Sequence, residues 1–370
     1  MVDATRSPGS EGELAAPGRG GGAAPMLVAS VLFPRHEANA PWMGVVTRIQ
    51  GDGSVLGAPD RAPERAKSSH RPSSLAEAAG ALAAAHAEGR RLRIGEDLRT
   101  ERLDRILEHE AGDLTCTVEA GIRLSTLQAS LVEHGQRLSL DPPGDPTVGA
   151  LLAQNLSGPL RHRFGAPRDL VLGVTLVLSD GTIASAGGKV VKNVAGYDLA
   201  RLVCGSRGLL ALIARVSLRL HPLPKAAQTL AVETDDAASA VSALLGSQLQ
   251  PSALDILYPG GVLVLFEGSP RAVEAQIAVA RQLVGGVEAD AGAWDVSRRR
   301  QSEARSRIRF DPGLLEPTLA GLREAVVRPA SGVAYSADES PSGSLLQGDV
   351  ETRLLERIRR ELDPNGVFAA

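Results

Sequence analysis

Two apolar segments joined by Asp180-Gly181 constrain the fold of this chain more than any other feature of its sequence. Residues 169–186 read DLVLGVTLVLSDGTIASA, so strand-forming residues flank the Asp-Gly pair on both sides. Asp-Gly is among the strongest sequence signals for a two-residue turn between antiparallel strands. A third apolar run, GLLALIARVSLRL, follows at residues 208–220. We therefore expect a β-hairpin and then a long strand.

A helix is predicted well before this hairpin. Ser74 and Glu77 have the spacing of a capping box, an alanine-rich run follows them, and Gly89 stands where a helix would end. The apolar residues of RLRI, at 91–94, then predict a strand.

The next two segments repeat these elements in the opposite order. DLTCTVEAG, at residues 113–121, predicts a strand, and LSTLQASLVEHG, at 124–135, predicts a helix. In that helix Ser125 and Gln128 have the spacing of a second capping box. The order helix–strand–strand–helix indicates an α+β fold.

A stiff turn and a short helix come next, in the segment LSLDPPGDPTVGALLAQNLSG at residues 138–158. Asp145 is expected to cap the helix and Pro146 to be its first residue, so that the helix spans 147–154. Its free N–H groups and small side chains would suit an anion or a flat ring close to the backbone.

The segment HPLP, at 221–224, contains two prolines and marks the predicted boundary between two folded regions. Residues 225–370 alternate strand patterns with helix patterns, as in GVLVLFEG followed by PRAVEAQIAVARQLV, and predict a second α+β domain. Residues 1–66 mix Gly, Pro, Ala and isolated charges without any period, so we expect a disordered N-terminal arm.

Composition argues against several classes of function. A net charge of −3 and an aromatic content of 3% argue against a nucleic-acid partner. No run approaches the ~18 apolar residues of an integral membrane segment. The two cysteines, Cys116 and Cys204, lie too far apart for a metal motif and indicate a cytoplasmic protein.

One short segment is strongly basic. SRRRQSEARSRIR, at residues 297–309, has two interpretations: a solvated helix face, which is the usual role of such a run, or a docking patch for an acidic partner.

Three segments in close succession resemble a known family. DPPGDPTVGALLAQNLSG, FGAPRDLVLGVTLVLSDGT and GGKVVKNVAGYDLARLVCGSRG resemble the FAD-binding domains of the vanillyl-alcohol oxidase and p-cresol methylhydroxylase type, and in particular the accessory flavin subunits of glycolate oxidases. The resemblance implies an α+β fold in which two subdomains, divided near residue 137 within residues 67–224, clasp FAD under a short cap domain at 225–370.

The same resemblance implies which residues contact a non-covalently bound FAD. Glycines would let the backbone approach the cofactor, and short polar side chains would satisfy its hydroxyl groups. Tyr197 and Asp198 have an alternative role, which is to cap and pack the helix that follows them. The full set implied is Gly95, Pro142, Thr147, Val148, Gly149, Asn155, Ser157, Gly158, Gly165, Asp169, Lys192, Asn193, Gly196, Tyr197, Asp198, Gly205, Ser206, Gly208 and Ile213.

The sequence departs from the family at the loop that usually cradles the FAD diphosphate. Where the family has a run of glycines, this chain passes from Ile94-Gly95 directly to Glu96-Asp97. Two carboxylates would then stand where two phosphates should bind, so we expect the affinity for FAD to be lowered.

A second departure concerns the chemistry of hydroxy-acid oxidation, which needs a base for the hydroxyl proton. All seven histidines precede residue 222, so the predicted cap domain contains none. We therefore expect a flavin subunit that passes electrons within a glycolate-oxidase-like complex, with a catalytic flavin subunit and an iron–sulfur subunit as partners, in the cytoplasm or at the inner face of the membrane through those partners. The alternatives are a structural subunit without flavin and a stand-alone FAD-dependent oxidase of a hydroxy acid or polyol.

Overall fold

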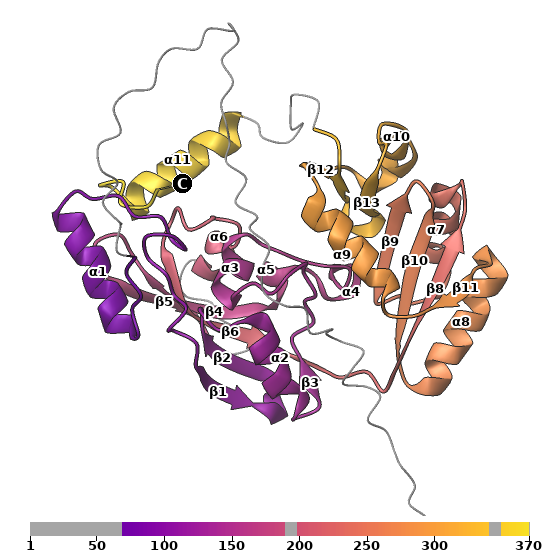
Figure 1. The fold of residues 1–370 in the computed structure, drawn as a ribbon, viewed down its shortest axis with the longest axis horizontal. Coiled ribbons are helices and arrows are strands. Elements are labelled where there is room, and N and C mark those ends of the chain that lie inside the picture. Colours follow the sequence, from indigo (N-terminus) through magenta and orange to yellow (C-terminus); the bar gives the residue numbers. More distant parts are fainter. Residues whose placement is uncertain (1–68, 189–197, 340–348, 370) are drawn as a thin grey trace, which may run out of the picture. The chain divides into compact units, whose positions relative to one another are not determined.

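The computed structural model describes residues 69–188, 198–339 and 349–369 (Figure 1). The part up to residue 222, here called the N-terminal module, is built on a five-stranded antiparallel sheet of order β1-β2-β6-β4-β5. Its strands are β1 (Ile106–Glu110), β2 (Thr115–Glu119), β4 (Val171–Val177), β5 (Ile183–Gly187) and β6 (Leu212–Arg219).

The predicted hairpin is confirmed as β4 and β5, and the predicted long strand is β6. Gly181 has a φ of +86°, the left-handed conformation that glycine adopts without strain in a tight turn. β6 pairs with β4 on one side and with β2 on the other. Strands from both sides of residue 137 therefore belong to one sheet.

The first predicted helix is also confirmed, whereas the strand predicted at 91–94 is wrong. Helix α1 (Leu75–Ala87) begins after Ser74, whose hydroxyl accepts the Glu77 N–H. Leu92 and Ile94 form only isolated bridges, Leu92 with Phe368 and Ile94 with Leu98. The chain turns back at Gly95 too early for a strand to extend.

The core beneath α1 is completed by the end of the chain. Leu82 of α1 is fully buried and belongs to the same cluster as Val367 and Phe368. The buried Asp363 accepts the backbone N–H groups of both these residues, at 2.8 and 2.9 Å. The last residues of helix α11 (Asp349–Leu362) and those after it therefore fasten onto the N-terminal module.

The predicted cap at Asp145 and the predicted capping box of Ser125 and Gln128 are both wrong, because Asp145 and Ser125 bond to each other. Asp145 does not cap the helix that follows it; its carboxylate accepts the N–H and hydroxyl of Ser125, at the start of α2 (Leu124–Val132). The Gln128 side chain bonds the backbone of Leu138 and not the helix end. Helix α3 (Val148–Ala153) starts after its own cap, Thr147.

The remaining elements of the N-terminal module are short. They are β3 (Gln136–Arg137), which pairs with β7 (His221–Pro222), and the helices α4 (Arg161–Phe164), α5 (Pro167–Leu170) and α6 (Leu199–Val203).

Residues 226–336, here called the C-terminal module, form a seven-stranded antiparallel sheet of order β11-β8-β10-β9-β13-β14-β12 (Figure 1). The elements are β8 (Ala226–Glu233), α7 (Ala237–Leu245), β9 (Ala253–Tyr258), β10 (Gly261–Gly268), α8 (Pro270–Val284), β11 (Val287–Ala289), α9 (Ala293–Glu303), β12 (Ser306–Arg309), α10 (Leu315–Ala320), β13 (Ala325–Arg328) and β14 (Val333–Ser336). The predicted strand at 261–268 and the predicted helix at 270–284 are both confirmed.

Alternation along β10 places helices on both faces of this sheet. Val264 packs in one cluster with residues of α7 and α8, whereas the neighbouring Leu263 packs against Trp294 of α9. Successive residues of a strand point to opposite faces, so α9 covers the face opposite α7 and α8.

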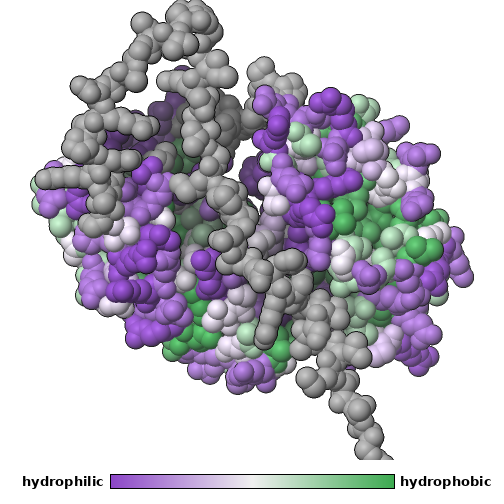
Figure 2. Space-filling model, in the orientation of Figure 1, coloured by the Kyte–Doolittle hydropathy of each residue, from purple (hydrophilic) through white to green (hydrophobic). Residues whose placement is uncertain are grey.

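The surface of the C-terminal module carries several exposed apolar side chains on α7, α8 and β11. Figure 2 shows hydrophobic surface on this half of the chain. Exposed large residues of these elements are Leu245, Val279, Leu283 and Val287. None of the helices in the described residues is long and apolar enough to cross a membrane.

Contacts between arginine and carboxyl side chains join the two modules. Arg137 of β3 donates two hydrogen bonds to the Glu267 carboxylate of β10, at 2.7 and 2.6 Å, and both side chains are buried. Arg298 of α9 lies 3.5 Å from the Asp141 carboxylate, which also accepts the Leu160 N–H.

Gly121 and Gly80 offer a matched test of backbone packing. A Cβ at Gly121 would lie 1.8 Å from the Thr100 carbonyl oxygen, whereas one at the helical Gly80 would meet nothing within 4 Å. We expect Gly121→Ala to lower the free energy of unfolding by about 1–3 kcal/mol and Gly80→Ala to raise it by about 0.4–1 kcal/mol. Urea unfolding measures both; equal effects of the two substitutions would contradict the packing.

Asp141 predicts a dependence of stability on pH. Burial raises the pKa of this carboxyl to about 7, against the opposing effects of Arg298 and the Leu160 N–H. Between about pH 4 and pH 7 the folded protein holds a proton that the unfolded chain releases, so stability falls as pH rises, by at most about 1.4 kcal/mol per unit.

In Asp141→Asn this dependence should be absent, so the variant gains stability relative to the parent as pH rises from 5 to 7.5. Urea unfolding at several pH values gives the difference directly. A constant difference across that range would contradict the raised pKa.

Candidate functional site

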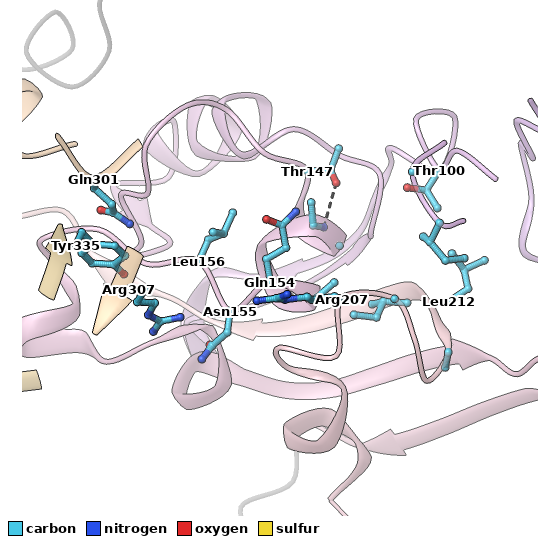
Figure 3. Close-up of a pocket in the computed structure, with 18 residues that line it drawn as sticks. Thr100, Thr147, Gln154, Asn155, Leu156, Arg207, Leu212, Gln301, Arg307 and Tyr335 are labelled. Atoms are coloured by element: carbon cyan, nitrogen blue, oxygen red, sulfur yellow. Dashed lines mark hydrogen bonds between the residues drawn. The ribbon is translucent and has the colours of Figure 1, made fainter. Parts of the chain in front are cut away.

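A cavity of about 560 Å³ lies where the N-terminal module meets the C-terminal module (Figure 3). This volume is within the usual ~300–1,000 Å³ of small-molecule and cofactor sites. Four stretches of the chain form its walls: the turn at 94–95 with Thr100, the residues from 147 to 156, the residues from 207 to 213, and three side chains of the C-terminal module.

Helix α3 gives the cavity a wall of small residues. The Thr147 hydroxyl accepts the Ala150 N–H at 3.2 Å and caps the helix, and Gly149 and Ala153 face the cavity with little side-chain bulk. A Cβ at Gly149 would lie only 3.0 Å from Ala120, so this glycine permits the close approach of α3 to the sheet. A side chain at this position would point toward Ala120, so it is the backbone of Gly149 that lines the cavity.

The end of α3 carries a polar residue in the left-handed conformation. Asn155 has a φ of +50°, and its Oδ1 is buried without a hydrogen-bond partner among the described residues. A buried acceptor without a partner is uncommon in folded proteins, so the Asn155 Oδ1 is available to a donor of a ligand. Gln154, beside it, also lines the cavity (Figure 3).

The loop after α6 forms the facing wall. Arg207 has a φ of +54° and is fixed by its N–H, which donates to the Ala153 carbonyl at 2.7 Å. Gly208 passes so close to Ile94 that a Cβ there would lie 3.1 Å from the Ile94 side chain. This contact brings the loop next to the 94–95 turn, and β6 continues the wall with Ile213.

The C-terminal module supplies the last wall through Gln301 of α9, Arg307 of β12 and Tyr335 of β14. The Arg307 guanidinium lies 5.8 Å from the centre of the Tyr335 ring, and the buried Arg328 lies on the same ring at 5.0 Å. The basic run at 297–309 is therefore not simply a solvated face, because Arg307 lines the cavity and Ser297 is fully buried.

The turn that replaces the glycine-rich loop has its amides already engaged. The N–H groups of Glu96, Asp97 and Leu98 all donate to the Arg93 carbonyl, and the Gly95 N–H donates to the Leu98 carbonyl. The Arg93 side chain pairs with the carboxylates of Glu96 and Asp97, at 2.7 and 3.4 Å. This turn has no spare N–H group for a phosphate.

Six of the residues implied by the sequence resemblance come together around the cavity: Gly95, Thr147, Gly149, Asn155, Gly208 and Ile213. Four more, Lys192, Asn193, Gly196 and Tyr197, lie outside the described residues.

The other implied residues do not line the cavity, and several have structural roles. Asp198 caps α6 through the Arg201 N–H, Asp169 accepts the Ala166 N–H beside Gly165, and a Cβ at Gly158 would lie 1.8 Å from the Asp141 carbonyl. Asp198 thus has the capping role that was its alternative. Also outside the lining are Pro142, Val148, Ser157, Gly205 and Ser206, of which Ser206 has a buried hydroxyl without a described partner.

Sequence reasoning missed the side chains that give the cavity its charge and polarity. Arg207 stands inside a motif noted only for its glycines, and Arg307 belongs to the basic run. Gln301 lies in the same basic run, which was noted only for its arginines, and Tyr335 comes from a strand that no local signal marks. The lining residues missed are Ile94, Thr100, Ala150, Ala153, Gln154, Leu156, Arg207, Ala211, Leu212, Gln301, Arg307 and Tyr335.

The described lining suits a large, partly anionic, partly apolar ligand. It combines two arginines, a tyrosine, amide side chains and an apolar wall, and it contains no carboxylate and no histidine. Nearby, burial raises the pKa of the Cys204 thiol to about 12, so Cys204 is protonated near neutral pH and is no nucleophile. The side chains alone carry no redox chemistry.

Comparison with known proteins agrees with this geometry. Residues 89–187 match the FAD binding domain family. Glycolate oxidase subunit GlcE of Escherichia coli is 35% identical over 201 residues, which are 53% of this chain and 56% of that protein. Glycolate oxidase subunit GlcD of Bacillus subtilis is 32% identical over 174 residues, 45% of this chain and 36% of that protein.

Solved structures share the fold at low identity. Alkyldihydroxyacetonephosphate synthase superposes with a TM-score of 0.61 at 15% identity, covering 80% of this chain and 74% of that one. The chain spans little more than half the length of GlcE and about a third of GlcD. Residues 89–187 therefore form a FAD binding domain of the p-cresol methylhydroxylase type within an α+β fold, and the chain is similar to subunits of glycolate oxidase.

Proposed function

We propose that this chain is a FAD-binding oxidoreductase subunit of a glycolate-oxidase-like complex, which passes on electrons from the oxidation of a 2-hydroxy acid. The observation that carries the proposal is the cavity. Its lining is cationic and polar, and it has a buried acceptor without a described donor at Asn155. Its walls at 94–100 and 147–156 lie within the residues that match the FAD binding domain family.

FAD, when bound, supplies the electron-accepting chemistry that the side chains lack. The chain's own residues bind and orient it. The small residues of α3 allow a planar group to lie against the backbone, and the Asn155 Oδ1 is available to accept a hydrogen bond. Arg307 and Tyr335 close the end of the cavity that the C-terminal module forms.

The described lining favours electron transfer over oxidation of a hydroxy acid by this subunit itself. Removal of the hydroxyl proton needs a base, and neither a histidine nor a carboxylate is found among the lining residues. His162 is the histidine closest in sequence to the lining segment 147–156 and could be considered as the base. It lies on α4 and outside the lining, however, and burial lowers its pKa. The catalytic base is then expected on a partner, a catalytic flavin subunit.

An iron–sulfur subunit is the second expected partner. Within the ranges that the structure describes, no group of three His, Cys, Asp or Glu residues could hold a metal ion. The exposed apolar residues on α7, α8 and β11 are the kind of surface that a subunit interface would cover (Figure 2). A cytoplasmic location, with contact to the membrane through these partners, is part of the same proposal.

One observation favours a second candidate function, a structural subunit without flavin. The turn at 95–98 offers no N–H group to a diphosphate, and hydrogen bonds to charged groups contribute roughly 1.5–3 kcal/mol each. A chain that has lost these bonds could keep the fold and its place in the complex while losing the cofactor.

The visible spectrum of the purified chain separates these two functions. We expect flavin in less than one equivalent after reconstitution with FAD, because the diphosphate lacks its usual amide donors. Inserting Gly-Gly-Gly-Thr between Gly95 and Glu96 should raise the flavin content, while the same insertion after the exposed Gly246, remote from the cavity, should not.

Full occupancy in the parent chain would show that the engaged turn does not limit affinity. Absence of flavin from the parent and from both insertion variants would favour the structural subunit.

A further inference from the structure

Arg207 is an exposed cation on the wall of the cavity, without a paired anion among the described residues. No hydrogen bond or ion pair of its guanidinium is found among the residues that the structure describes, and the side chain lines the cavity. Figure 3 shows it beside Gln154, with Thr100 and Leu212 toward one end of the cavity and Arg307 and Tyr335 toward the other. An arginine in this position is available to an anionic part of a ligand.

The backbone holds Arg207 in place at a conformational cost. A φ of +54° is unusual for a long side chain, and it is fixed by the hydrogen bond from the Arg207 N–H to the Ala153 carbonyl. This bond ties the loop to the last turn of α3. Strained residues that line a cavity are typical of binding sites, because the surrounding structure must impose the strain.

The neighbouring turn explains what Arg207 would replace. Gly208 packs against Ile94, so the backbone of Arg207 is next to the turn in which the N–H groups of residues 95–98 are all engaged. The carboxylates of Glu96 and Asp97 lie against Arg93, which leaves the Arg207 charge uncompensated by them. Arg307 is less suited to this part of the cavity, because it lies toward the other end with Tyr335.

We propose that Arg207 binds the diphosphate of FAD, in place of the backbone N–H groups that a glycine-rich loop would supply. The proposal rests on the proposed function, since it concerns how the same cavity holds its cofactor. The planar guanidinium offers a fork of donors that matches two phosphate oxygens. The donors of one side chain then replace part of the hydrogen bonds that the backbone of a glycine-rich loop would make to the phosphates.

The test compares three ligands that share different parts of FAD. FAD contains both flavin and diphosphate, ADP contains the diphosphate without flavin, and riboflavin contains no phosphate. Arg207→Asn removes the charge with a residue that tolerates a positive φ. We expect it to weaken FAD and ADP binding by roughly 10–100-fold and to leave riboflavin binding unchanged, measured by titration calorimetry and by flavin fluorescence.

Two further variants sharpen the comparison. Arg219→Gln removes an exposed arginine at the end of β6 away from the cavity, and it should change none of the three affinities. Arg207→Lys keeps the charge without the fork and should give an intermediate loss for FAD and ADP.

Unchanged FAD and ADP affinities in Arg207→Asn would overturn the proposal. An equal loss of riboflavin would also overturn it, because Arg207 would then act by shaping the cavity. If the parent chain binds neither FAD nor riboflavin, the proposed function fails, while the ADP titrations still decide the role of Arg207.

Discussion

The buried ion pair of Arg328 and Asp255 is the interaction that holds the cavity together. Both side chains are almost completely withdrawn from solvent, at 1% and 0% exposure. Burying two charges is costly unless every donor and acceptor finds a partner. Ser297 donates to the Asp255 carboxylate, and Arg328 donates to Gln301 at 2.6 Å, so the cost is offset by a network of hydrogen bonds.

This network ends on the N-terminal module. Arg328 and Gln301 both donate to the Ser157 carbonyl, at 3.2 and 2.8 Å, two residues after Asn155. The C-terminal module thereby fixes the segment of the cavity wall that contains Asn155 in its left-handed conformation. Ser157, which the family resemblance implied as a cofactor contact, is fully buried and outside the lining, and its carbonyl accepts both of these hydrogen bonds.

How far the sequence predicts this protein depends on how local each signal is. The hairpin at Asp180-Gly181, the cap at Ser74 and the helix at 270–284 follow from neighbouring residues, and all three are confirmed. Asp145 was misassigned because its partner, Ser125, is 20 residues away. A carboxylate beside two possible helix starts cannot be assigned from the chain order alone.

The candidate site shows the same limit more strongly. Glycines and short polar residues of one module could be proposed from a motif, and five of them line the cavity together with Ile213. Arg307 and Tyr335 reach it only because β12 and β14 pair at one edge of a distant sheet. Their arrival depends on the packing of two modules, which no run of neighbouring residues encodes.

The packing of Phe368 beneath α1 has a consequence for how the chain is made. The first helix is synthesised about 280 residues before the side chains that complete its core, and contacts of such long separation form slowly because a long loop must close. During synthesis the apolar face of α1 stays incompletely covered until Val367 and Phe368 are made, whereas the C-terminal module can already assemble its own sheet. The core of the N-terminal module is therefore completed only after the C-terminal module has been synthesised.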